Sequence, residues 1–202
     1  MAEPVSTTIS LLALVVSGIT AWMSLLRRGA LRMTRPTFIS FNYDKLGPNG
    51  HVIKPKVFIR GLLYSTGTRG RVIQNMFVTL QQGGAKHDFT VWGHGNTSLS
   101  RGSGLFAPPI GIAENHHFNP PDGSPEFRFS AGEYELRIFA EIVAASRPKE
   151  LCRVQLSVMD DALPHPLEDE AAIWFDWDPI KKQYHAHVET RSDPIGLGLY
   201  LA

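Results

Sequence analysis

Residues 133–143 read EYELRIFAEIV and decide the fold class, because polar and apolar side chains alternate along them. A period of two places successive side chains on opposite faces of a β-strand. One apolar face and one polar face are typical of a half-buried antiparallel strand. The predicted inward positions are Tyr134, Leu136, Ile138, Ala140 and Ile142.

The same pattern recurs through the rest of the chain. Residues 151–159 repeat it, with Cys152, Val154, Leu156 and Val158 predicted to point inward. Turn-forming pairs such as Gly83-Gly84 separate the segments, and no long helical period follows residue 35. Short strands at roughly ten-residue spacing predict a mainly β, antiparallel β-sandwich over residues 34–202. Weaker strand candidates cover residues 37–43, 56–64, 72–80, 87–92, 127–129, 173–177 and 184–188.

The segment Ser130-Ala131-Gly132-Glu133-Tyr134 is similar to the tyrosine corner of immunoglobulin-like sandwiches. In that motif a tyrosine near the start of a core strand bonds the backbone a few residues upstream. Leu136 stands where antibody domains carry their second cysteine, so a disulfide-free immunoglobulin-like fold is expected. An ordinary hairpin entry containing glycine is the alternative.

Residues 5–26, VSTTISLLALVVSGITAWMSLL, contain no charged side chain. A helix of this length reaches about 33 Å, and a bilayer core is about 30 Å thick. Ser and Thr residues, among them Ser6, Thr7, Thr8, Ser10, Ser17 and Thr20, lower its hydropathy, but their hydroxyls can bond back to helix carbonyls. Residues 1–33 are therefore predicted to contain one transmembrane helix, with the lipid bilayer as partner of residues 5–26. A buried helix of a soluble protein is the alternative, and a secretory signal is disfavoured because no basic residue precedes the apolar run.

Charge predicts the orientation of this helix. Arg27, Arg28, Arg32 and Arg35 follow the apolar run, and no Lys or Arg precedes it. The positive-inside bias then places the N-terminus outside and the C-terminal domain in the cytoplasm, at a bacterial inner membrane. A single cysteine, Cys152, agrees with a reducing compartment.

This layout resembles a loose group of bacterial single-pass membrane-anchored β-sandwich proteins of unknown function. The resemblance lies in the apolar span, Thr34-Arg35-Pro36, residues 62–73 (LLYSTGTRGRVI) and the strand of Tyr134. It implies the architecture and brings no catalytic residues.

His185, His187 and Glu189 alternate near the C-terminus. In a strand they share one face, about 7 Å apart in succession, while Tyr184, Ala186 and Val188 face the core. Two imidazoles and a carboxylate are possible ligands of Zn, Fe or Mn. The alternative is an ordinary solvated strand face.

The string Asn115-His116-His117-Phe118-Asn119, followed by Pro120-Pro121-Asp122-Gly123, has no counterpart elsewhere in the chain. Asn115, His116 and His117 are candidate binding residues. Adjacent histidines in a strand point to opposite faces, so both cannot serve one metal unless the strand bulges. A histidine that satisfies a backbone carbonyl is the alternative.

The composition restricts the function. With 20 basic and 19 acidic residues the net charge is +1, which argues against a strongly basic nucleic-acid-binding module. No phosphate-binding loop, GxSxG or HExxH motif occurs. The sequence predicts a membrane-tethered, non-catalytic binding or scaffold domain with a protein partner and no cofactor. A metal-dependent enzyme using the His/Glu site and a structural homo-oligomer are the alternatives.

Overall fold

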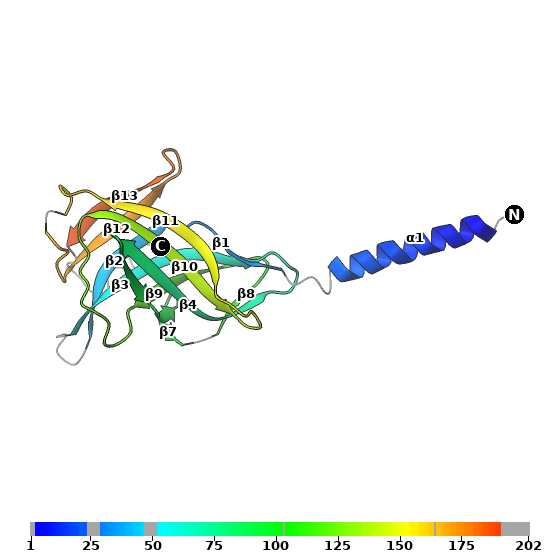
Figure 1. Ribbon diagram of the computed structural model, residues 1–202, viewed down its shortest axis with the longest axis horizontal. Coiled ribbons are helices and arrows are strands. Elements are labelled where there is room, and N and C mark those ends of the chain that lie inside the picture. Colours follow the sequence, from blue (N-terminus) through cyan, green and yellow to red (C-terminus); the bar gives the residue numbers. More distant parts are fainter. Residues whose placement is uncertain (1–2, 24–28, 47–51, 103, 164, 191–202) are drawn as a thin grey trace.

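The computed structural model (Figure 1) describes residues 3–23, 29–46, 52–102, 104–163 and 165–190. Helix α1 (Glu3–Ala21) is followed by strands that form two layers. The strands are β1 (Leu31–Met33), β2 (Phe38–Leu46), β3 (Val52–Ser65), β4 (Arg71–Gln82), β5 (Ala85–Phe89), β6 (Val91–His94), β7 (Ser100–Arg101), β8 (Leu105–Ala107), β9 (Ile112–Asn119), β10 (Gly132–Ile142), β11 (Lys149–Val158), β12 (Ala171–Asp178) and β13 (Gln183–Thr190).

The strands form two antiparallel sheets. The larger has the order β13-β12-β2-β3-β9-β6-β7, and β1 pairs with β3 beside β2. The smaller has the order β11-β10-β4-β5, and β8 pairs with β4. A mainly β, antiparallel fold is confirmed, and the two sheets are consistent with a β-sandwich. Residues 31–33, predicted to belong to the N-terminal segment, are part of the larger sheet.

The core lies between the two sheets. All five predicted inward residues of β10 are buried, and on β11 Val154, Leu156 and Val158 are buried while Cys152 is half-buried. From the larger sheet, Phe41 enters the centre of the core. Its ring lies 4.8 Å from the ring of Phe129, 5.4 Å from that of Tyr134 and 4.9 Å from that of Phe175, measured between centroids. The period-two pattern therefore predicted the correct faces of β10 and β11.

The tyrosine corner forms as predicted. The Tyr134 hydroxyl donates to the backbone oxygen of Ser130 at 2.5 Å and accepts from the backbone nitrogen of Ser130 at 2.9 Å. Gly132 turns the chain between them with φ of 133°, a conformation that favours glycine. From the other sheet, the Tyr43 hydroxyl accepts a hydrogen bond from the backbone nitrogen of Phe129 at 2.9 Å. Tyr43, in the larger sheet, and Tyr134, in the smaller sheet, thus both form hydrogen bonds with the backbone of residues 129–130.

Two strand predictions need correction, and the sequence pattern missed β9 and the short strands β1, β7 and β8. Residues 127–129 form no strand, because the amide of Phe129 bonds a tyrosine hydroxyl in place of a neighbouring strand. Residues 87–92 divide between β5 and β6, which lie in different sheets. Strand β9 was not predicted, although it pairs with β3 on one side and β6 on the other. Its sequence, IAENHHFN, lacks the alternation that marks β10.

The N-terminal segment forms a helix, and Figure 1 shows it projecting away from the sandwich. Ser10 and Thr20 donate hydrogen bonds to the carbonyls of Ser6 and Val16, at 2.9 and 2.8 Å, as expected for hydroxyls in an apolar helix. Among the described residues, no helix combines the length and apolarity needed to cross a membrane. The predicted transmembrane helix over residues 5–26 is therefore not supported: α1 ends at Ala21, and residues 24–26 lie outside the described part of the chain.

The sandwich has two ends, which we call basal and distal. At the basal end β3 finishes at Ser65, and the amide of Thr66 bonds the carbonyl of Ala30, where the chain arrives from α1. At the distal end lie Tyr43, Ile53 and Asn119. Twelve residue steps of β3 separate Ile53 from Ser65, which is about 40 Å for an extended strand.

Tyr134→Phe is expected to lower the free energy of unfolding by about 1–3 kcal/mol, because it leaves the partly buried amide of Ser130 without its acceptor. Tyr64→Phe is the matched control, since the Tyr64 hydroxyl has no hydrogen-bond partner among the described residues. Denaturant unfolding of the full chain measures both. Equal stabilities for the two variants would contradict a structural role for the corner.

Candidate binding site

Two hollows lie side by side at the distal end, where β2, β3 and β9 meet the segment that leads from β9 to β10. They share Lys54 and Pro120, and an ion pair between Lys54 and Asp122 lies at their boundary. This pair holds the pKa of Asp122 below its ordinary value, through its hydrogen bond and the Lys54 charge. The string predicted as a candidate, residues 115–123, supplies residues to both hollows.

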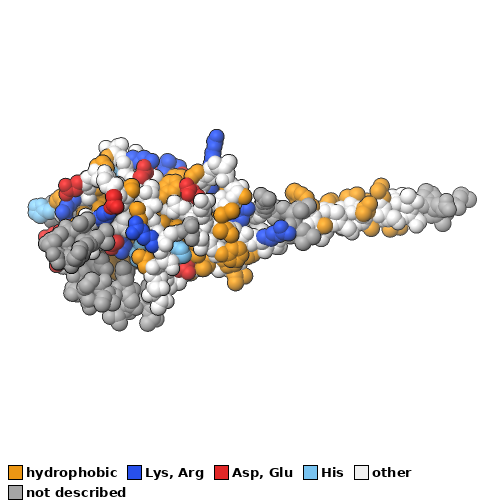
Figure 2. Space-filling view, turned by 90° about the horizontal axis from the view of Figure 1, so that it is seen from below, with side chains coloured by type: hydrophobic (Ala, Val, Ile, Leu, Met, Phe, Trp, Pro, Cys, Tyr) orange, Lys and Arg blue, Asp and Glu red, His pale blue; other side chains and the backbone are white. Residues whose placement is uncertain are grey.

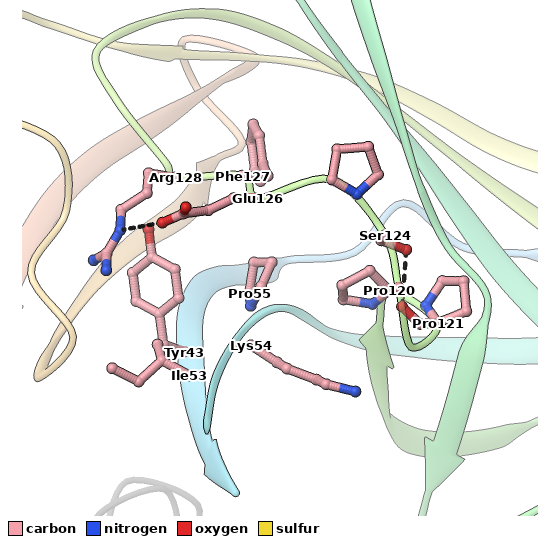
Figure 3. A pocket seen from close by; sticks show the side chains of 12 residues that line it. Tyr43, Ile53, Lys54, Pro55, Pro120, Pro121, Ser124, Glu126, Phe127 and Arg128 are labelled. Carbon is pink, nitrogen blue, oxygen red and sulfur yellow. Dashed lines mark hydrogen bonds and ion pairs between the residues drawn. The ribbon is translucent and has the colours of Figure 1, made fainter. Parts of the chain in front are cut away.

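The first, which we call the proline hollow, has a volume of about 250 Å³. Figure 3 shows Tyr43 and Ile53 on one side and Pro120 and Pro121 on the other. Proline rings have a fixed backbone angle, so this wall is formed before any ligand arrives. The complete lining is Tyr43, Ile53, Lys54, Pro55, Pro120, Pro121, Gly123, Ser124, Pro125, Glu126, Phe127 and Arg128.

Arg128 fixes one rim of the proline hollow. Its guanidinium lies 5.5 Å from the Tyr43 ring centroid and 2.6 Å from a carboxylate oxygen of Asp169. A second carboxylate, that of Glu126, lies 3.8 Å from Arg128, as the dashed line in Figure 3 marks. The Asp169 hydrogen bond raises the pKa of Arg128, so this cation is permanent. The rim is polar, and proline and aromatic rings form part of the interior.

The second, which we call the charged hollow, has a volume of about 320 Å³. Asp44 accepts hydrogen bonds from Lys56 at 2.8 Å and from the Asn119 amide nitrogen at 3.2 Å. Arg101 is exposed and forms no ion pair with a described acidic residue. The lining is Asp44, Lys54, Val91, Trp92, Gly93, Leu99, Arg101, His117, Asn119, Pro120 and Asp122.

His117 is the predicted candidate that lines the charged hollow. Burial, and next the charge of Lys56, lower its pKa from 6.5 to about 4. The ring is therefore neutral at pH 7, and its buried Nδ1 has no hydrogen-bond partner among the described residues. The neutral ring therefore forms part of the wall of the hollow without adding a charge to it. Asn115 lies on the same side of β9, 8% exposed, and lines neither hollow.

His116 points to the opposite side of β9 and is fully buried. Its Nδ1 accepts a hydrogen bond from Nε1 of Trp92 at 3.3 Å, and burial lowers its pKa to about 3. The structure thus separates the two adjacent histidines, and His116 belongs to the interior. The alternative prediction was that such a ring bonds a backbone carbonyl. The partner of the His116 ring is instead the indole of Trp92.

His185, His187 and Glu189 lie on the exposed face of β13, and Tyr184, Ala186 and Val188 pack against the core. His185 Nε2 lies 3.2 Å from an Asp178 oxygen, and His187 lies 3.6 Å from oxygens of Asp176 and Glu189. Within the described residues, no three His, Cys, Asp or Glu side chains form a group able to hold a metal ion. His185, His187 and Glu189 therefore share one face of β13, as predicted, but their side chains do not converge on one point.

The four arginines predicted to set the topology have different positions. Arg27 and Arg28 lie outside the described residues. Arg32 is exposed on β1, and the Arg35 guanidinium lies 4.2 Å from the centroid of the Trp177 ring. Arg35 therefore has a structural contact within the domain.

Sequence reasoning missed Tyr43, Lys54, Arg101 and Arg128 as site residues, because they come from separate strands and from loops. The available signal was the density of prolines at 120, 121 and 125. Prolines at this density were interpreted only as turn formers. These prolines form a wall of the proline hollow only because the segment after β9 packs against β2 and β3.

The two adjacent histidines of β9, His116 and His117, make the free energy of unfolding depend on pH. Their folded pKa values lie below the ordinary 6.5, so above pH 6.5 they are neutral in both states. As pH falls from 6.5 toward 4, the unfolded chain takes up protons that the native state does not, and stability is lost.

His117→Gln is expected to remove up to about 1.4 kcal/mol per pH unit of this slope, the value for one proton. Denaturant unfolding between pH 7 and pH 4.5 measures the slope. Ser157→Ala, on the exposed face of β11, removes no titratable group and is the control that keeps the slope. An unchanged slope in His117→Gln would show that His117 titrates as in an unfolded chain.

No protein-family model matches the chain, and no curated protein matches it significantly. No function is therefore transferred from relatives. What the protein does has to be argued from the two hollows and from the rest of the surface.

Proposed function

We propose that the protein is a non-catalytic binding domain, an immunoglobulin-like sandwich held at the cytoplasmic face of a bacterial inner membrane, whose distal hollows take a segment of a partner protein. The observation that carries the proposal is that a hollow with proline and aromatic rings in its wall adjoins a hollow with charged side chains in its wall, at the distal end and away from the helix. The tyrosine corner at Tyr134 supports the immunoglobulin-like assignment.

The chemistry of the hollows favours a peptide ligand. The proline hollow offers Tyr43 and proline rings to an apolar side chain, and the charged hollow offers Arg101 and His117 to a polar one. Because the hollows share Lys54 and Pro120, one extended segment of a few residues covers both. An aromatic and apolar centre with a polar rim is usual for protein-binding surfaces.

Binding fits these residues better than catalysis. Lys54 and Lys56 are each paired with a carboxylate, Asp122 and Asp44, so their charges already hold the loops together. A general base needs a pKa near the working pH, and that of His117 is about 4. These groups can orient a ligand without exchanging protons with it.

Membrane attachment is supported by the surface of α1 and the segment after it. Figure 2 shows hydrophobic side chains along the projecting helix. Covering apolar surface is worth about 25 cal/mol per Å², and acyl chains can cover this helix. The arginines that follow favour the cytoplasmic side for the sandwich. The exposed apolar side chains are Ile9, Leu11, Leu12, Leu14, Val15, Val16, Ile19, Trp22 and Met23, each at least half exposed.

The binding proposal is tested in living cells with a photo-crosslinking amino acid in place of Pro125, an exposed residue of the proline hollow. We expect one adduct of defined mass, identified by mass spectrometry, and a several-fold lower yield when Arg101→Ala is added. The same probe at Gln81, exposed on β4 in the other sheet, is the control. Equal adducts at the two positions, or none at Pro125, would refute the site.

The attachment proposal is tested by flotation of the full chain with vesicles. Leu12→Glu combined with Val16→Glu is expected to abolish flotation, because each charge costs about 2.5–3.5 kcal/mol near the centre of an inserted helix. Ser10→Ala combined with Ser17→Ala is the control and floats like the natural chain. Flotation of the glutamate variant would exclude insertion of α1.

A further inference from the structure

Four apolar side chains are exposed at the basal end. Val72 is 43% exposed, Phe106 55%, Ile110 91% and Val143 49%. Val72 lies opposite Phe106 in the pairing of β4 with β8, and the amide of Val143 bonds the carbonyl of Val72 at 3.0 Å. Ile110 belongs to the turn after β8, where Pro108 accepts a hydrogen bond from the amide of Ser65. These side chains therefore belong to one region.

This region lies where the chain arrives from α1. Ala30 and Thr66 form two hydrogen bonds, of 3.0 Å between Thr66 N and Ala30 O and 2.8 Å between Ala30 N and the Thr66 hydroxyl. In Figure 2 hydrophobic side chains gather on the part of the sandwich nearest the helix, with basic side chains beside them. Six residue steps join Met23 to Gly29, so this end stays within about 20 Å of the helix.

Basic side chains surround the apolar ones. The pKa of Lys149 is lowered by burial and then by the charges of Arg32 and Arg71, so these three cations lie near one another. Nε of Arg71 is buried without a partner among the described residues. Arg69 is exposed just before β4, and Arg147 is exposed just before β11.

These five cations differ from most of the basic residues elsewhere in the described part of the domain. None of them forms an ion pair with an acidic side chain in the described part of the chain. By contrast, seven of the twelve other described basic residues do so: Lys45 with Glu170, Lys54 with Asp122, Lys56 with Asp44, Lys86 with Asp88, Arg128 with Asp169, Arg137 with Glu135 and Arg153 with Glu150. The remaining five, which also lack an ion pair with a described acidic residue, lie apart from the basal residues: Arg35, Arg60, Arg101, Lys181 and Lys182. The basal end thus carries uncompensated positive charge next to exposed apolar groups.

We propose that this basal surface, made of Val72, Phe106, Ile110, Val143, Arg32, Arg69, Arg71, Arg147 and Lys149, rests on the headgroups of an anionic bilayer. The inference builds on membrane attachment through α1 and adds that the sandwich itself contacts the lipid. Cations are attracted to an anionic surface, and apolar tips enter the headgroup layer. This orientation turns the distal hollows away from the membrane.

The experiment uses the full chain carrying Cys152→Ala, with one new cysteine labelled by an environment-sensitive fluorophore. Ile110→Cys reports the basal surface, and Ala85→Cys is the matched control at the other end of the β4 ladder. The probes are phosphatidylcholine vesicles with and without about a third of phosphatidylglycerol. We expect the label at residue 110 to shift to the blue and brighten several-fold with anionic vesicles, and the label at 85 to stay unchanged.

A second comparison tests the role of charge. Arg69→Gln is expected to reduce the response at residue 110 at least twofold while flotation is retained, and Lys86→Gln, which removes the same charge near the distal end, leaves it intact. If the chain floats but the label at 110 stays water-exposed, the basal surface is refuted and attachment through α1 stands. If the chain does not float, both fail. A shift that needs no lipid and grows with protein concentration would identify contact between copies and refute the lipid surface.

Discussion

The hydrogen bonds between two tyrosine hydroxyls and the backbone of Phe129 and Ser130 are the constraint on which the distal end depends. Residues 120–131 cross from the larger sheet to the smaller one without pairing as a strand. Their buried backbone needs partners, and Tyr43 and Tyr134 supply them from opposite sheets. The stacked rings of Phe41 and Phe129 then fill the space between the layers. The same segment forms the wall of the proline hollow, so the core and the candidate site share one support.

The two ends of the sandwich differ in how their charges are used. At the distal end Lys54, Lys56 and Arg128 are each matched with a carboxylate that fixes a loop, which leaves shaped hollows with few free charges. At the basal end the cations lack such partners, and apolar side chains stand beside them. The first arrangement selects a ligand by shape and hydrogen bonding. The second attracts an extended anionic surface whatever its detailed structure.

The adjacent histidines of β9 lie on opposite sides of the strand and have different surroundings. His116 lies in the interior against Trp92, and His117 opens toward the charged hollow. Burial keeps both rings neutral at physiological pH, so neither adds a charge to the core or to the hollow.

The sequence by itself determined the faces of β10 and β11, the tyrosine corner, and the helical hydroxyls that bond back to the carbonyls of Ser6 and Val16. Each of these depends on residues close together in the chain, where a period of two or a spacing of four is sufficient. It did not determine β9, whose Asn and His residues become strand members only because β3 and β6 pair with them. Nor did it determine the hollows, the basal surface, or the separation of the β13 histidines from any common centre. Those depend on which residues of distant strands become neighbours, and that follows from register and packing between the sheets, which local alternation does not encode.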